Sequence, residues 1–132
     1  MSTTEDVLPD RSGTRRTLAI EDDVSELRRA RDWVREQLTG LTADQAEDVV
    51  LAADELVSNA LRHGAAPRTL TLLLRPGSLR FEVEDGEPAP ARPREGTTTG
   101  GRGLTLVDAL ATDWGQQPTG RGKVVWAEFT LD

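Results

Sequence analysis

A long segment with helical periodicity, residues 42–63, constrains the fold more than any other part of the chain. Thr42 and Gln45 form a capping-box pair that marks a helix start. Gly64, with Pro67 beyond it, marks the helix end. Apolar residues recur between these signals at spacings of three and four, which places them on one broad arc of the helix. The residues of this arc are Val49, Val50, Ala53, Leu56, Val57, Ala60 and Leu61.

The rest of the chain predicts one further long helix and a set of strands. Residues 23–38 carry apolar positions at helical spacing among charges, so we expect a surface helix that ends at Gly40. Residues 79–84 alternate strictly between apolar and charged side chains, which predicts a strand with one wet face. The mostly apolar residues 69–74 and the Pro-Gly-Ser turn at 76–78 complete an antiparallel hairpin.

Shorter elements complete the pattern. We expect a strand at 17–20, an apolar helix at 104–110 and a closing hairpin of residues 112–116 and 123–131. The order along the chain is strand, two helices, two strands, loop, helix and two strands. This order predicts an α+β fold, a two-layer α/β sandwich with the helices packed on one face of a mixed, mostly antiparallel sheet.

The chain length allows one domain. Its 132 residues can bury one core but not two. Residues 1–15 are polar and lack periodicity, so we expect a flexible N-terminal tail there and one domain over residues 16–132. Residues 86–103 also lack an apolar pattern, and a loop of this length inside a compact domain is usually functional or disordered.

Composition excludes several classes of function. There are 23 acidic and 16 basic residues, and the net charge of −7 gives no footprint for direct nucleic-acid binding or for an anionic membrane surface. Without cysteine there are no disulfides, no thiol catalysis and no Cys-bound zinc, and with one histidine a multi-histidine metal site is hard to build. The longest apolar run, Val49–Ala53, is too short to span a bilayer, and the N-terminus lacks the features of a secretory signal. We therefore expect a cytoplasmic protein.

The polar side of the long helix is the first candidate for chemistry. Glu55, Asn59 and Arg62 lie close together there, because spacings of three and four place side chains over one another. An Asn oxygen can ligate Mg²⁺, and a Glu can accept a proton from a hydroxyl that attacks a γ-phosphate. The same spacing also occurs on ordinary solvated helix faces, so on this motif alone both interpretations stay open.

Two further motifs can bind parts of a nucleotide. The glycines of residues 100–103 precede an apolar helix start, and glycine backbone N–H groups with a helix N-terminus can hold phosphate. Asp85 ends an alternating strand and precedes Gly86, and its carboxylate can accept from an exocyclic amine such as that of adenine. The alternatives are a flexible loop for the first motif and a turn-forming Asp-Gly pair for the second.

The three motifs together resemble a known superfamily. Segments 55–64 (ELVSNALRHG), 83–86 (VEDG) and 101–107 (GRGLTLV) stand in the order and spacing of the Bergerat-fold (GHKL) ATP-binding domain of gyrase, heat-shock chaperones, histidine kinases and mismatch-repair proteins. Within this superfamily the chain is similar to the small stand-alone anti-sigma factor serine/threonine kinases. The resemblance covers about residues 16–132.

The resemblance implies a role for each matching residue, with ATP and Mg²⁺ as cofactors. Glu55 matches the catalytic base and Asn59 the Mg²⁺ ligand. His63 matches a position that contacts phosphate or supports the site, although a helix C-terminal cap is the alternative. Asp85 matches the adenine-reading carboxylate. The other implied nucleotide contacts are Gly86, Gly101, Arg102, Gly103 and Leu104, with residues 86–100 as the ATP lid; Arg102 could touch phosphate or be solvated only.

Two residues depart from the superfamily pattern. Many members place Gly two positions after the adenine-reading Asp, where this chain has Glu87. Lys123 stands where Thr is frequent. Both departures concern the adenine motif, whereas Glu55 and Asn59 match the pattern.

The resemblance thus implies an ATP- and Mg²⁺-dependent protein serine/threonine kinase. Such a protein phosphorylates an anti-sigma factor antagonist and sequesters a sigma factor, so it regulates transcription without contacting DNA or membrane, and it is compatible with a homodimer. Since 132 residues hold no dimerising helical pair with a phosphoacceptor histidine, we expect no histidine kinase activity. The alternative function is a non-catalytic, ATP-sensing module that binds protein partners.

Overall fold

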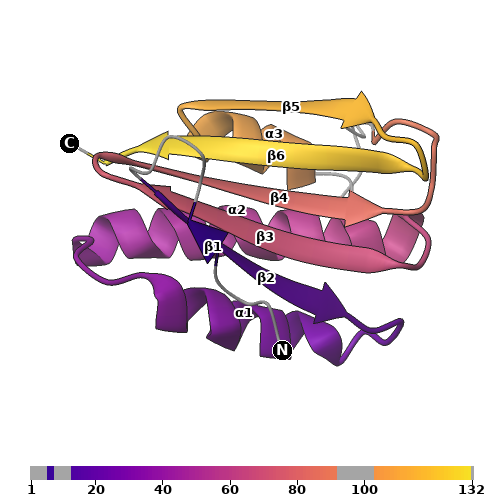
Figure 1. Ribbon diagram of the computed structural model, residues 1–132, viewed down its shortest axis with the longest axis horizontal. Coiled ribbons are helices and arrows are strands. Elements are labelled where there is room, and N and C mark those ends of the chain that lie inside the picture. The colour runs from indigo at the N-terminus through magenta and orange to yellow at the C-terminus, as the bar shows by residue number, and fades with distance from the viewer. Residues whose placement is uncertain (1–5, 8–12, 92–102, 132) are drawn as a thin grey trace.

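The computed structural model describes residues 6–7, 13–91 and 103–131, which form two layers (Figure 1). The helices are α1 (Glu26–Gln37), α2 (Ala43–His63) and α3 (Gly103–Leu110). The strands are β1 (Asp6–Val7), β2 (Thr14–Ile20), β3 (Arg68–Arg75), β4 (Ser78–Asp85), β5 (Asp113–Pro118) and β6 (Lys123–Thr130). They form a single sheet in the order β1-β2-β3-β4-β6-β5.

The three helices lie on one face of the sheet, behind it in Figure 1. α2 lies between α1 and α3 and packs on β4 and β6, while α1 reaches β2 and α3 reaches β5. This arrangement confirms the predicted α+β sandwich. Every strand pair among the described residues is antiparallel, so the sheet there is more uniform than the mixed sheet we expected.

The core lies between α2 and the inner face of the sheet. Leu79, Phe81 and Val83 of β4 are buried, as their alternation predicts, and Phe81 stacks on Phe129 of β6 with ring centroids 6.0 Å apart. The apolar arc of α2 covers them, and six of its seven residues are buried. Each fully buried aliphatic or aromatic side chain contributes about 1.5–3 kcal/mol, so this layer contact carries much of the folding free energy.

Local sequence signals set the ends of α2. The Thr42 hydroxyl accepts from the Gln45 backbone N–H at 3.1 Å, and the Gln45 side chain accepts from the Thr42 N–H at 2.9 Å. The predicted capping box is therefore confirmed, and the helix ends at His63 with Gly64 as its C-cap. The other predicted helices and strands are also present, with ends that differ by up to three residues.

The N-terminal edge of the sheet differs from the expectation. β2 begins at Thr14, and Asp6–Val7 pair with Arg15 and Thr14, so the sheet includes part of the segment assigned to a tail. Strand pairing uses backbone groups, and a two-residue strand has no side-chain periodicity by which a sequence could reveal it.

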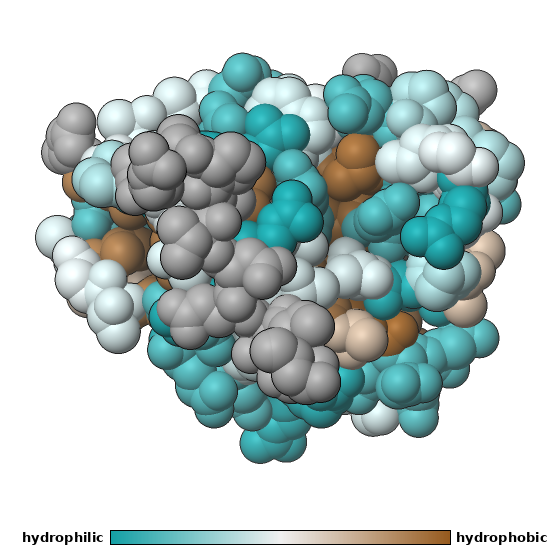
Figure 2. Space-filling model, in the orientation of Figure 1, coloured by the Kyte–Doolittle hydropathy of each residue, from teal (hydrophilic) through white to brown (hydrophobic). Residues whose placement is uncertain are grey.

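The outer face of the sheet is mostly polar, as the alternation of β4 predicts. Arg80 lies over the ring of Trp126, with its guanidinium carbon 4.2 Å from the ring centroid. It also forms ion pairs with Glu82 at 2.9 Å and Glu128 at 3.0 Å. Figure 2 shows this side of the molecule, where hydrophilic residues dominate and hydrophobic ones form only small separate areas. Among the described helices, none has the length and apolarity that crossing a membrane requires.

Candidate functional site

Three residues spaced by four along α2 form one end of the site. Glu55 and Asn59 are half-buried and His63 is exposed at the end of the helix. Burial raises the pKa of Glu55, the neighbouring carboxylate of Asp54 raises it further, and Arg62 opposes both effects. A carboxylate with a raised pKa holds a proton more tightly than free glutamate, which suits a proton acceptor. We call Glu55, Asn59 and His63 the helix end.

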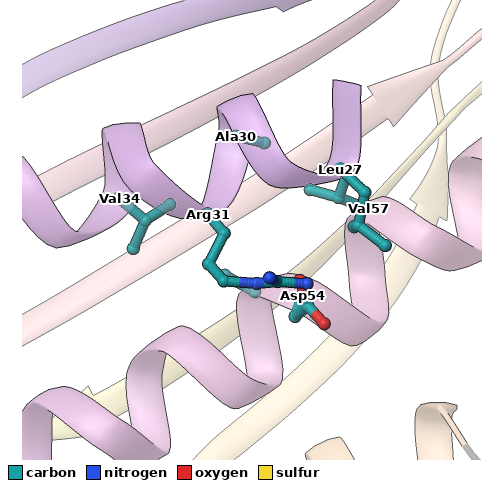
Figure 3. A pocket seen from close by; sticks show the side chains of 7 residues that line it. Leu27, Ala30, Arg31, Val34, Asp54 and Val57 are labelled. Atoms are coloured by element: carbon teal, nitrogen blue, oxygen red, sulfur yellow. The ribbon is translucent and has the colours of Figure 1, made fainter. Parts of the chain in front are cut away.

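Asp54, the carboxylate beside Glu55, forms an ion pair with a residue of α1. Arg31 of α1 donates from Nε to Oδ1 of Asp54 at 3.0 Å, and Figure 3 shows the Arg31 side chain extending from α1 to Asp54 on α2. Leu27, Val34 and other apolar side chains surround this contact. The hollow between the two helices has no room for a ligand, so it serves packing and is separate from the site.

An ion pair on the sheet forms the other end of the site. Asp85 is the last residue of β4 and Lys123 the first of β6, and they face each other in the antiparallel register. Lys123 Nζ lies 3.1 Å from Asp85 Oδ1, and the two side chains are 5% and 2% exposed. Nζ also donates to the Glu87 carbonyl at 3.2 Å, while the Glu87 N–H donates to Asp85 Oδ1 at 2.7 Å. We call Asp85, Lys123 and Glu87 the sheet end.

Close backbone packing joins the two ends at Asp85. A Cβ at Gly64, the cap of α2, would lie 2.6 Å from Cγ of Asp85. A Cβ at Gly122 would lie 2.0 Å from the Asp85 carbonyl oxygen. The Gly86 N–H donates to the Ala65 carbonyl at 2.7 Å, which ties the segment after α2 to the end of β4. Glycine is required at positions 64 and 122 because no larger residue fits between these backbones.

An open pocket of about 360 Å³ lies between the helix end and the sheet end. This volume lies in the range of small-molecule sites. The lining residues are Asn59, His63, Glu87, Ala89, Pro90, Ala91 and Lys123. A second hollow of about 240 Å³ adjoins it and shares Pro90 and Lys123. Gln116, which lines the second hollow, binds the backbone of Ala91, which lines the first: its side chain accepts from the Ala91 N–H at 2.7 Å and donates to the Ala91 carbonyl at 2.8 Å.

The structure brings several of the predicted site residues to this pocket. Asn59 and His63 line it, and Asp85 lies buried at its edge behind Lys123. Glu55 is one helical turn from Asn59 and is not among the lining residues.

The remaining predicted contacts lie at the two ends of the proposed lid along the sequence. Gly86 packs on the backbone of Ala66. Leu104 is buried in the core, so a nucleotide would meet only its backbone. Gly103 is the first residue of α3, and Gly101, Arg102 and most of the proposed lid lie outside the described residues.

Sequence reasoning did not assign Lys123 and Glu87 to the site, although it singled out both as departures from a pattern. A signal for Lys123 was present in the alternation of its strand. Lys123 has the same parity as Val125, Ala127 and Phe129, which are buried on the inner face. A charged residue at an inward position of a strand is rare unless it is paired, and it therefore indicates a buried partner.

Comparison with known protein families gives one match over most of the chain. The model of the histidine kinase-like ATPase domain matches residues 20–129. Among curated proteins, none matches this chain.

Solved structures show the same fold at low sequence identity. The structure of the RsbU and RsbW domains of a Mycobacterium tuberculosis protein has a TM-score of 0.70 at 22% identity, covering 89% of this chain and 32% of that one. The blue-light activated histidine kinase of Erythrobacter litoralis has a TM-score of 0.57 at 23% identity, covering 81% and 41%. Its histidine kinase domain has a TM-score of 0.55 at 22% identity, covering 81% and 60%. The chain thus spans less than two thirds of each of these proteins, and at such identities the likeness concerns the fold.

Proposed function

This chain belongs to the histidine kinase-like ATPase domain family, and on that premise we propose that it binds ATP with Mg²⁺ and acts as a protein serine/threonine kinase. The observation that carries the proposal is the alignment of Glu55, Asn59 and His63 on one face of α2, where Asn59 and His63 line an open pocket and Glu55 lies one helical turn before Asn59. Among the described residues, a pocket of this size has room for part of a nucleotide.

The chain supplies a group for each requirement of phosphoryl transfer. The amide oxygen of Asn59 would hold Mg²⁺, which when bound offsets the negative charge of the phosphates. Glu55 would take the proton of the attacking Ser or Thr hydroxyl, a role that its raised pKa supports. The hydroxyl oxygen then bonds to the γ-phosphorus while the bond to the bridging oxygen breaks, so that ADP leaves.

We propose further that the protein substrate is an anti-sigma factor antagonist and that the chain sequesters a sigma factor in the cytoplasm. Two observations support this assignment. The three nucleotide motifs resemble the stand-alone anti-sigma factor kinases, and one structure of similar fold contains a domain named RsbW. The acidic net charge of −7 fits protein partners better than nucleic acid.

Phosphosite mapping tests the proposal. The protein is incubated with ATP, Mg²⁺ and antagonist proteins encoded in the same genome, and the products are analysed by mass spectrometry. Transfer of phosphate to a Ser or Thr of one antagonist, lost in Glu55→Gln, is the expected result. Phosphate on histidine, or none on any antagonist, would contradict the kinase.

A second candidate function rests on the sheet end. Because Lys123 already occupies an oxygen of Asp85, the chain could sense ATP and bind partners without transferring phosphate. This module would bind an antagonist in an ATP-dependent way, and Glu55→Gln would leave that binding unchanged. A wild-type protein that binds both ATP and an antagonist yet never phosphorylates it would decide for the module.

A further inference from the structure

We propose that Lys123 determines base selectivity in the pocket, because its ammonium group occupies Asp85 in place of the exocyclic amine of a purine. Nucleotide affinity then does not depend on that amine. The inference rests on the proposed nucleotide binding and concerns the part of the pocket where this chain departs from the superfamily pattern.

The hydrogen bonds of Asp85 are the first line of support. Its Oδ1 accepts from Lys123 Nζ at 3.1 Å and from the Glu87 N–H at 2.7 Å, and a carboxylate oxygen has about two lone-pair sites. The other oxygen, Oδ2, lies on the side of Gly64, where even a Cβ would come within 2.7 Å of it. With its side chain 2% exposed, Asp85 offers an incoming amine little unoccupied acceptor surface.

The strength of the competing bonds is the second line of support. The exocyclic amine of a base is neutral, whereas Lys123 brings a full charge to the carboxylate, and charge-assisted bonds are roughly twice as strong as neutral ones. The Lys123 ammonium donates to Asp85 and to the Glu87 carbonyl. If an amine displaced it from Asp85, only the bond to the Glu87 carbonyl would remain of these two. An unpaired charge at a buried position is costly, so an amine gains little by replacing Lys123.

The N–H donors of the Lys123 ammonium indicate which group of the base would bind here in place of the exocyclic amine. An ammonium group has three N–H donors, and two are used on Asp85 and the Glu87 carbonyl. Lys123 lines both hollows, so the remaining donor suits an acceptor on the base, such as a ring nitrogen or a 6-oxo group. Inosine triphosphate, which carries an oxygen where ATP carries the amine, is therefore expected to bind about as well as ATP.

Calorimetric titration with Mg²⁺-ATP and Mg²⁺-inosine triphosphate tests the inference on three proteins. Wild type is expected to bind both within about threefold, whereas Lys123→Thr frees Asp85 and should prefer ATP by about tenfold or more, the gain from one charge-assisted hydrogen bond. Arg121→Thr, an exposed cation two residues away, is the control and should behave as wild type. If Lys123 only supported the fold, both affinities would change together and their ratio would stay constant.

A measurement on the unmodified protein covers the case in which Lys123→Thr fails to fold. Lys123 is the one lysine of the chain, so lysine labelled with ¹³C at the ε carbon gives a single side-chain resonance. ATP and inosine triphosphate should both shift it, whereas inorganic tripolyphosphate with Mg²⁺ should not.

The possible failures are distinguishable. A wild-type preference for ATP of about tenfold or more, an unchanged ratio in Lys123→Thr, or equal effects of all three ligands on the resonance would overturn the inference and leave the proposed function intact. Absence of binding by either nucleotide to every variant would overturn the proposed function and the inference with it.

Discussion

The helix end and the sheet end of the pocket hold their charges in opposite ways. Glu55 sits half-buried beside another carboxylate, and its raised pKa indicates that its negative charge is poorly accommodated by the fold. Asp85 is almost fully buried, yet it is matched by a lysine and a backbone N–H. The first arrangement is typical of a group kept for chemistry, and the second of a group that supports the structure.

This contrast also separates the residues that match the superfamily pattern from those that depart from it. The helix end carries the residues that match the resemblance, while the sheet end carries both departures. The contrast predicts that removing charge at the helix end costs activity but not stability, and that removing it at the sheet end costs stability.

Glu55→Gln has the largest expected effect, on phosphotransfer. The amide keeps the size of the side chain but cannot take a proton at neutral pH, so the rate should fall by about 10²–10⁴-fold while ATP affinity changes little. Single-turnover assays and calorimetry measure the two quantities. Glu47→Gln, on an exposed part of the same helix, is the control. A variant that keeps full activity would remove Glu55 from the chemistry.

Asp85→Asn tests the sheet end through stability. Were Asp85 only a nucleotide ligand, an isosteric amide would leave folding nearly unchanged. Because it pairs with Lys123, the substitution leaves a buried ammonium without its counter-charge, and the free energy of unfolding should fall by about 3–5 kcal/mol. Urea denaturation measures the loss. The double variant Asp85→Asn with Lys123→Met should recover part of it, and an equal loss in both would show that the pair is not the cause.

Gly122→Ala tests whether the sheet end also depends on close packing. Its new methyl group would collide with the backbone at Asp85 and Gly86, so we expect a loss of about 1–3 kcal/mol in the free energy of unfolding. Gly120→Ala is a matched control in the same turn, since a Cβ there meets nothing within 4 Å. Equal stabilities of the two variants would mean that the backbones can separate without cost.

The smallest predicted effect is a gain in stability at the helix end. Since the pKa of Glu55 is raised in the folded state, the folded protein binds this proton more tightly than the unfolded chain does. Ionised Glu55 therefore lowers the free energy of unfolding at neutral pH, and the penalty disappears as pH falls below the ordinary value of 4.5. Thermal unfolding should show Glu55→Gln slightly more stable than wild type at pH 7–8 and equal to it below that value. If Glu55→Gln were less stable than wild type at neutral pH, the contrast between the helix end and the sheet end would be contradicted.

The helix end could be predicted from sequence because its geometry is local. Glu55, Asn59 and His63 lie on one helix, and a period of 3.6 residues fixes which side chains share a face. The alternation in β4 likewise separates buried Phe81 on the inner face from Arg80 on the outer face without knowledge of the partner strand. Capping chemistry set the start of α2 for the same reason, since both partners lie within one turn.

The sheet end could not be predicted because its geometry is not local. Lys123 is 38 residues from Asp85, and their contact exists because β6 pairs with β4 in one register. The alternation of β6 indicates which face Lys123 takes, but a shift of two residues would keep that face and give Lys123 another partner, and no signal within either strand excludes such a shift. The sequence alone therefore determined the elements, the α+β class and the chemical groups along α2. Tertiary structure decided which charge faces Asp85, because that contact depends on the summed packing of strands far apart along the chain.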